Sequence, residues 1–175
     1  MPRAARQHPD VRPLRADDGG GEGHTMTGTI RIERATAADA EAIASIVRGL
    51  GRDENIGLPA EFDAETARTW LSRLGENGVI LLAYEGSIPV AFGAIDYSTV
   101  EPNTALLGVW VLPDFRRRGI GTALAEELLE FARERGYKRI RGRLPEGNEP
   151  ALSFLSSIGA MVPLRNPDMR FELPL

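Results

Sequence analysis

Hydrophobic and polar residues alternate at 30–34 and 138–144, with the two-residue period typical of half-buried strands. Short, mostly apolar runs predict further strands at 79–84, 88–97 and 104–112, and two last strands are predicted at 161–164 and 170–173. Glu85, Gly86 and Ser87 separate the strand predicted at 79–84 from that at 88–97, and a short glycine-containing loop of this kind predicts a β-hairpin.

Apolar residues recur at helical spacing in four other stretches. Thr36 and Asp63 are favourable N-cap residues, and the apolar stripes behind them predict helices that run to about residue 50 and to residue 74. The longest stripe predicts a helix at 119–135, and a shorter helix is predicted at about 148–158.

The predicted elements follow the order β-α-α-β-β-β-α-β-α-β-β. A strand–helix–strand unit spans 104–144, which predicts two parallel neighbours joined by a right-handed crossover, whereas the hairpin predicts antiparallel neighbours. We therefore expect a fold of the α/β class (α+β mixed), in which a mixed central sheet of about seven strands is flanked by about four helices.

Residues 1–28 differ from the rest of the chain, because prolines and a run of three glycines interrupt any period and large apolar residues are few. Such a segment buries too little surface to offset the entropy of ordering it. It has the features of neither a secretory signal nor a transit peptide. We expect a disordered leader, or an upstream extension of a chain that starts near Met26, followed by one domain at 29–175.

Composition narrows the chemistry of that domain. The net charge of −4 argues against a nucleic-acid binder held by bulk electrostatics. The absence of cysteine excludes thiolate metal sites and a cysteine nucleophile. The two histidines, His8 and His24, fall in the predicted leader, which argues against a histidine base or a histidine-bound metal. No stretch reaches the roughly 18 apolar residues that a membrane span needs.

The most informative stretch is an apolar strand that ends at Pro113, three consecutive arginines, and a helix that opens on Gly119 and Gly121. A helix N-terminus presents unpaired N–H groups and the positive end of the helix dipole. Glycines let a diphosphate approach that backbone, and arginines add charge-assisted hydrogen bonds. The turn has the chemistry of a pyrophosphate site, although the same arginines equally suit a solvated turn.

The sequence does not match two other nucleotide-binding motifs. A Walker loop requires Gly-x4-Gly-Lys-Ser/Thr, which the sequence lacks. A Rossmann fingerprint requires a third glycine where Leu124 stands, and an acidic residue after the next strand where a ribose would bind. A NAD-type domain stays a further hypothesis, which predicts binding of that cofactor.

These residues resemble the GNAT superfamily of acyl-CoA-dependent N-acetyltransferases. Its hallmark, Gln/Arg-x-x-Gly-x-Gly/Ala at a strand-to-helix turn, is matched by residues 116–121, and the preceding Val-x-Val-x-Pro strand at 109–113 is also similar. A second family block, Asn-x-x-Ala followed by a hydrophobic helix and a Gly-aromatic end, resembles 148–160, although Ala160 stands where the family usually has the aromatic residue. The resemblance covers roughly residues 30–175 and implies a mostly antiparallel sheet with one splayed parallel strand pair.

The resemblance also implies an acetyl-CoA site. The amides of the turn would hold the pyrophosphate, the backbone of the splayed strand would bind the pantetheine arm, and a free N–H would polarise the thioester carbonyl. The implied cofactor-binding residues are Val109, Val111, Arg116, Arg117, Arg118, Gly119, Ile120, Gly121, Thr122, Asn148 and Phe154. As alternatives, Asn148 suits a plain helix cap and Phe154 suits the core.

The chain departs from the family pattern at its acid and base. A tyrosine commonly follows the asparagine as general acid, but that position is Leu155, which cannot donate a proton. Near the splayed strand the nearest carboxylates are Glu101 and Asp96, so these are the candidate catalytic bases. Each also suits an ordinary role, Glu101 in a turn and Asp96 facing solvent.

In this family the loop between the first two helices largely sets the choice of substrate. Here it carries Asp53 and Glu54 among four acids in residues 52–63, which suits a cationic amine and equally suits solubility. Asp53 and Glu54 are the candidate substrate-binding residues.

The sequence therefore predicts an N-acetyltransferase that passes an acetyl group from acetyl-CoA directly to an amine of a small molecule or peptide. A covalent intermediate is not expected, because the chain offers no cysteine and no serine–histidine pair. The alternative is a catalytically weak or inactive coenzyme-A-binding regulatory module. We expect no metal, nucleic-acid or membrane partner, a monomer or homodimer, and a cytoplasmic location.

Overall fold

The computed structural model describes residues 13–14, 29–51, 57–143, 153, 156–157 and 170–175. Its strands are β1 (Pro13–Leu14), β2 (Ile30–Arg34), β3 (Val79–Glu85), β4 (Ile88–Tyr97), β5 (Thr104–Val111), β6 (Arg139–Arg143) and β7 (Arg170–Pro174). Its α-helices are α1 (Ala40–Gly49), α2 (Ala64–Leu74) and α3 (Ile120–Glu134), with short 3₁₀ turns at Ala37–Asp39 and Pro113–Phe115. These elements confirm the predicted mixed α/β fold class.

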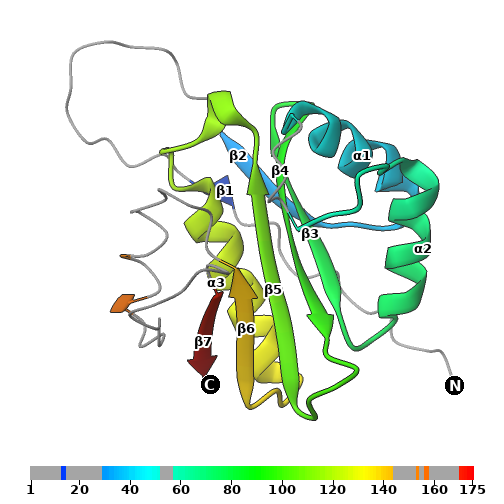
Figure 1. Cartoon of the computed structure of the whole chain (residues 1–175). Coiled ribbons are helices and arrows are strands. Elements are labelled where there is room, and N and C mark those ends of the chain that lie inside the picture. Colours follow the sequence, from blue (N-terminus) through cyan, green and yellow to red (C-terminus); the bar gives the residue numbers. More distant parts are fainter. Residues whose placement is uncertain (1–12, 15–28, 52–56, 144–152, 154–155, 158–169) are drawn as a thin grey trace, which may run out of the picture.

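The described strands form one sheet in the order β1-β2-β3-β4-β5-β6-β7. Every neighbouring pair in that sheet is antiparallel except β5 and β6, which are parallel and are joined through α3. The helices α1 and α2 lie to one side over β3 and β4, and α3 lies behind β4 and β5 (Figure 1). The mostly antiparallel sheet with one parallel pair is therefore confirmed.

The strand and helix counts differ slightly from expectation. Pro13 and Leu14, within the predicted leader, pair with Arg31 and Ile30 and add β1 to the edge of the sheet. The strand predicted at 161–164 lies outside the described residues. Most of the helix predicted at 148–158 lies outside them too, although its described serines have helical backbone.

Two helix starts follow the predicted capping chemistry. The backbone N–H of Thr36 donates to the Asp39 carboxylate at 2.8 Å, which fixes the turn that leads into α1. The Asp63 carboxylate accepts from the backbone N–H of Thr66 at 2.8 Å, which satisfies one of the unpaired donors at the start of α2. The hydrogen bonds that Thr66 donates to Asp63 also lower the pKa of the Asp63 carboxyl group.

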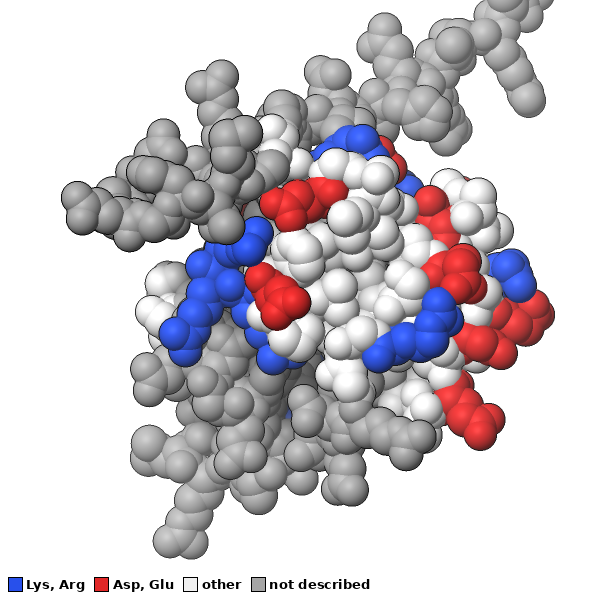
Figure 2. All heavy atoms as spheres, turned by 90° about the horizontal axis from the view of Figure 1, so that it is seen from above, with Lys and Arg blue, Asp and Glu red and all other residues white. Residues whose placement is uncertain are grey.

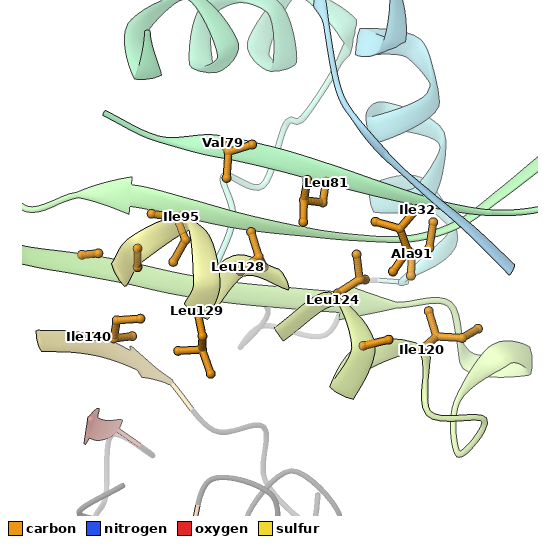
Figure 3. Close-up of a cluster of buried hydrophobic side chains, with 14 of the residues drawn as sticks. Ile32, Val79, Leu81, Ala91, Ile95, Ile120, Leu124, Leu128, Leu129 and Ile140 are labelled. Atoms are coloured by element: carbon orange, nitrogen blue, oxygen red, sulfur yellow. The ribbon is translucent and has the colours of Figure 1, made fainter. Parts of the chain in front are cut away.

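Side chains that alternate along the central strands supply a separate core to each face of the sheet. On one face, Leu124 and Leu128 of α3 pack toward Leu81 of β3 and Ile95 of β4 (Figure 3). On the other face α1 and α2 pack over the opposite side chains of the same strands, around the fully buried Phe92. α3 is thus held against the sheet, with its N-terminus beside the end of β5.

Candidate functional site

The strands β5 and β6 are paired along only part of β5. Their register runs from Thr104–Arg139 to Leu107–Gly142, and β5 continues alone on that side to Val111. On its other side β5 stays paired with β4 over its whole length. Residues 108–111 therefore form a segment, here called the separated segment, with one open side among the described residues.

The backbone of the separated segment presents unpaired polar groups on that open side. Leu112 donates its N–H to the Val90 carbonyl at 3.0 Å, toward β4. Because backbone groups alternate sides along a strand, the N–H groups of Val109 and Val111 point away from β4. The Val111 carbonyl accepts from Nε of Arg116 at 3.0 Å, while both N–H groups lack a backbone partner within the described residues. They are available to an extended ligand.

The turn between β5 and α3 contains two residues in the left-handed region. Arg117 has φ of 62° and Gly119 has φ of 78°. The first helical hydrogen bond of α3 runs from the N–H of Ala123 to the Gly119 carbonyl, so the N–H groups of residues 120–122 remain for an anion. The turn therefore has the local geometry of an anion site at a helix N-terminus.

The three arginines of the turn differ in what they contact. Arg116 folds back onto Val111, and Arg118 lies 3.6 Å from Glu85 with its guanidinium 5.1 Å from the ring centroid of Phe115. Arg117 has no ion-pair partner within the described part of the chain. Figure 2 looks down on this end of the molecule and shows basic side chains in several groups around the described surface, with acidic side chains between them.

The start of α3 lies directly against the separated segment. A Cβ at Gly121 would stand 3.5 Å from Val111 and 3.6 Å from Val109, an ordinary contact distance. Ile120 is buried in the core, so only its backbone can face a ligand, whereas the Thr122 side chain is exposed. The helix N-terminus and the open strand backbone are thus adjacent parts of one site.

Asp96 is held by four hydrogen bonds beside this site. Its carboxylate accepts from Trp70 Nε1 at 3.1 Å, from the two Nη atoms of Arg73 at 3.0 and 2.6 Å, and from the N–H of Tyr97 at 2.8 Å. The hydrogen bonds to Asp96 raise the pKa of the Arg73 guanidinium above its ordinary value. Accepting a substrate proton would require Asp96 to weaken this network.

Glu101 lies before β5, at the end of the strand opposite the turn. The strand that separates it from the turn, Thr104 to Val111, is roughly 24 Å long at about 3.4 Å per residue. One carboxylate oxygen pairs with Arg141, whose other Nη lies 3.3 Å from Glu172, and the second oxygen is buried without a partner among the described residues. Glu101 is thus beside the paired part of β5, and its role as a base stays a prediction.

Comparison with known proteins decides the family. The model of the acetyltransferase (GNAT) family matches residues 45–160, which include the separated segment, the turn and α3. The chain belongs to the acetyltransferase (GNAT) family. The family resemblance predicted from the sequence is therefore confirmed.

Two individual N-acetyltransferases share about a third or less of their aligned residues with this chain. The chain is 34% identical over 95 residues to an uncharacterized N-acetyltransferase of Methanocaldococcus jannaschii, covering 51% of this chain and 42% of that protein. It therefore spans less than half the length of that relative. It is 27% identical over 143 residues to the thialysine N-epsilon-acetyltransferase of Mus musculus, covering 74% of this chain and 83% of that one.

Solved GNAT structures share the fold. The PaiA N-acetyltransferase of Thermoplasma acidophilum, solved in complex with coenzyme A, superposes with a TM-score of 0.66 at 19% identity. The match covers 83% of this chain and 99% of that one. At this identity the likeness concerns the fold alone.

Several residues that the GNAT resemblance singles out lie outside the described residues. These are the candidate substrate residues Asp53 and Glu54, the candidate cofactor residues Asn148 and Phe154, and Leu155 at the usual tyrosine position. Their roles stay predictions.

The GNAT domain also contains a cleft that sequence reasoning missed. It has a volume of about 510 Å³ and lies between residues 57–62 and α2, with Trp70 and Asp96 among its lining residues. The periodicity of α2 places Trp70 on the apolar face of the helix, and only its bond to Asp96, 26 positions away, distinguishes it from a core residue. No local sequence pattern reveals this hydrogen bond between Trp70 and Asp96.

The described residues contain neither a metal-binding cluster nor a membrane-spanning helix. No group of three or more His, Asp or Glu side chains there could hold a metal ion. No helix in the described part of the chain is long and apolar enough to cross a membrane.

Proposed function

We propose that the protein is an N-acetyltransferase that transfers an acetyl group from acetyl-CoA directly to a primary amine. The observation that carries this proposal is the adjacency of two features. The helix N-terminus at residues 119–122 offers N–H groups to a pyrophosphate, and the open backbone at Val109 and Val111 offers hydrogen bonds to the pantetheine arm. One elongated ligand with a diphosphate at one end fits both.

In the proposed step the neutral amine nitrogen attacks the thioester carbonyl carbon. A C–N bond forms, the C–S bond breaks, and coenzyme A leaves as a thiolate. Negative charge that develops on the carbonyl oxygen would be stabilised by a free N–H of the separated segment. The amine loses one proton and the thiolate takes up one, so the products are an amide and free coenzyme A.

The proposed cofactor residues are those of the turn and the separated segment. Arg116, Arg117 and Arg118 would supply positive charge, and Asn148 and Phe154 would line the pantetheine arm from the following helix. Glu101 and Asp96 are the proposed bases, of which Asp96 is nearer the separated segment because it is paired with Leu106 across β4 and β5. The pH dependence of kcat/KM in Glu101→Gln and Asp96→Asn tests these two roles.

The acceptor is proposed to be an amine of a small molecule or peptide. The name of the mouse relative, a thialysine N-epsilon-acetyltransferase, supports a primary amine as the acceptor class. Asp53 and Glu54 would face this substrate. We propose a cytoplasmic location, where acetyl-CoA is made and used, and a monomer or homodimer.

A thermal melt with acetyl-CoA tests the cofactor part of the proposal. Ligand at about 100 times its Kd adds roughly 2.7 kcal/mol of stability. At roughly 2–4 °C per kcal/mol, the Tm should rise by about 5–11 °C. NADH and ATP serve as control ligands, and Gly121→Trp serves as a control variant that fills the approach to the helix N-terminus. No rise with millimolar acetyl-CoA in the wild type would refute the proposal.

Turnover separates the enzyme from a coenzyme-A-binding module. The module is favoured by the ion pairs that hold Asp96 and Glu101 and by Leu155 at the usual tyrosine position. Release of free thiol from acetyl-CoA on addition of a primary amine supports the enzyme. A clear Tm rise with acetyl-CoA, combined with no thiol release across an amine panel, would favour the module.

A further inference from the structure

The cleft beside α2 has mainly apolar walls. Leu58, Pro59, Phe62 and Trp70 contribute them, from the segment before α2 and from the helix itself. Phe62 and Trp70 meet edge to face, with ring centroids 6.3 Å apart. The cleft therefore presents an aromatic corner to anything that enters it.

The charged side chains that line the cleft are largely neutralised by neighbours. Asp96 is bound by both Nη atoms of Arg73, which also lines the cleft. Glu65 lies 3.4 Å from Arg68 on the next turn of α2. With Arg68 counted, two acids and two arginines lie at the cleft, so these described residues carry no net negative charge that would favour a polycation over an apolar amine.

Trp70 is fixed in place by contacts on several sides. Its Nε1 donates to Asp96, and its ring lies edge to face with Phe92 at 6.4 Å and with Trp110 at 6.2 Å. An aromatic side chain held at this many points keeps a single orientation, because a rotated ring would lose both the hydrogen bond and the ring contacts. Trp70 therefore forms a rigid wall.

Trp70 also contacts Trp110, which belongs to the separated segment of β5. Trp110 stacks on Phe92 at 4.8 Å, and its ring covers Gly108, where a Cβ would come within 2.2 Å of the indole. Gly108 is the first residue of β5 beyond the last pair with β6. Because α3 covers the opposite face of β5, the face that Trp110 and Trp70 occupy is the one from which a second substrate would approach this segment.

We propose that Phe62 and Trp70 are specificity-determining residues that select primary amines carried on an apolar skeleton, such as arylalkylamines. This inference rests on the proposed acetyltransferase function. The apolar part of the acceptor lies in the cleft, and its amino group extends past Trp110 toward the thioester at the separated segment.

The test compares thiol release from acetyl-CoA with 2-phenylethylamine and with spermidine. Wild-type kcat/KM should be at least about 10-fold higher for 2-phenylethylamine. Trp70→Ala should raise the KM for 2-phenylethylamine by about 10- to 100-fold while the KM for acetyl-CoA stays unchanged. Trp70→Phe should recover most of the loss, and Ser72→Ala, on an exposed position of the same helix, should change neither KM.

The outcomes separate this inference from the proposed function. Absence of both the Tm rise with acetyl-CoA and thiol release with every amine overturns the proposed function and this inference together. A clear Tm rise with spermidine used as well as or better than 2-phenylethylamine overturns the apolar specificity alone. The apolar specificity would also be overturned if Trp70→Ala raised the KM values for both amines equally, or if it changed the KM for acetyl-CoA.

Discussion

Gly119 and Gly121 stand two residues apart in the turn, yet they meet different physical constraints. Gly119 has a positive φ and open space around it, so its constraint lies in the backbone. Gly121 is helical, and a Cβ there would make ordinary contacts with Val109 and Val111. The sequence predicted a glycine-rich turn, but the division of roles needed the dihedral angles.

Alanine at these two positions should therefore change the stability of the ligand-free protein in opposite directions. Gly119→Ala forces a side chain into the left-handed region, which costs about 1 kcal/mol and should lower Tm by about 2–4 °C. Gly121→Ala replaces a helical glycine and should raise Tm by about 1–4 °C. Differential scanning calorimetry without ligand checks both signs, and a fall of similar size in both variants would contradict the assignment.

Asp63 should make a pH-dependent contribution to stability as the N-cap of α2. Its pKa is lowered in the folded state, chiefly by the hydrogen bond from the Thr66 backbone. A lowered folded pKa means that the contribution is complete above the unfolded value of 3.8 and is lost as the pH falls through the folded value.

Asp63→Ala should accordingly lower Tm at pH 7, and the difference from the wild type should shrink as the pH falls below about 3.8. Urea unfolding of both proteins between pH 7 and pH 2.5 measures the trend. A difference that stays constant over this range would show that the ionised carboxylate is not the cap.

At the scale of the elements, local sequence patterns predicted the helices and strands with a regular hydrophobic pattern. They missed a very short strand and the contacts between residues far apart in the sequence. The stripe of α3 is strong because the helix buries many residues on one face, and the apolar runs of β3 and β4 are strong because these strands are buried on both faces. β1 could not be predicted, because two residues carry no period. The ion pair of Glu101 with Arg141 joins positions 40 apart, so no local spacing could reveal it. The pyrophosphate turn was predictable because its glycines and arginines are consecutive.

The packing of α3 on the sheet depends on the absence of a side chain at Gly93 in β4. A Cβ there would lie 2.6 Å from Cδ1 of Leu128, which is fully buried. Gly93→Ala should therefore destabilise the protein by about 1–3 kcal/mol through overpacking, and Leu128→Ala should cost about 2–5 kcal/mol through the cavity it leaves.

The double variant should be less unstable than the sum of the two, because the alanine methyl group at position 93 would occupy space that Leu128 leaves. A coupling energy of at least about 1 kcal/mol is expected from urea unfolding of all four proteins. Additive losses would show that the strain at position 93 comes from another neighbour, such as the Gly108 carbonyl at 3.2 Å.

At the scale of the whole molecule, the strand order separates the edge that β1 forms from the candidate site. Three strands lie between β1 and β5, and β1 contributes only the pairs Pro13–Arg31 and Leu14–Ile30. The predicted domain at 29–175 therefore contains the separated segment, the turn and both cores.

A variant that lacks residues 1–25 should keep the fold and the response to acetyl-CoA. Loss of β1 should lower Tm by less than about 4 °C, which corresponds to roughly 1 kcal/mol in a domain of this size. The Tm rise with acetyl-CoA should equal that of the full chain. A truncated protein that does not fold would show that the leader is an integral part of the domain.

Among the residues that the structure describes, residues 108–111 of β5 lack a strand partner on one side, which places an open sheet edge in the middle of the sheet rather than at its margin. Unpaired strand backbone of this kind is a template for pairing with another chain, and proteins usually shield it. A pantetheine arm bound along residues 108–111 would act as a surrogate strand. Occupancy by acetyl-CoA should therefore slow self-association on storage and heating, beyond its effect on Tm.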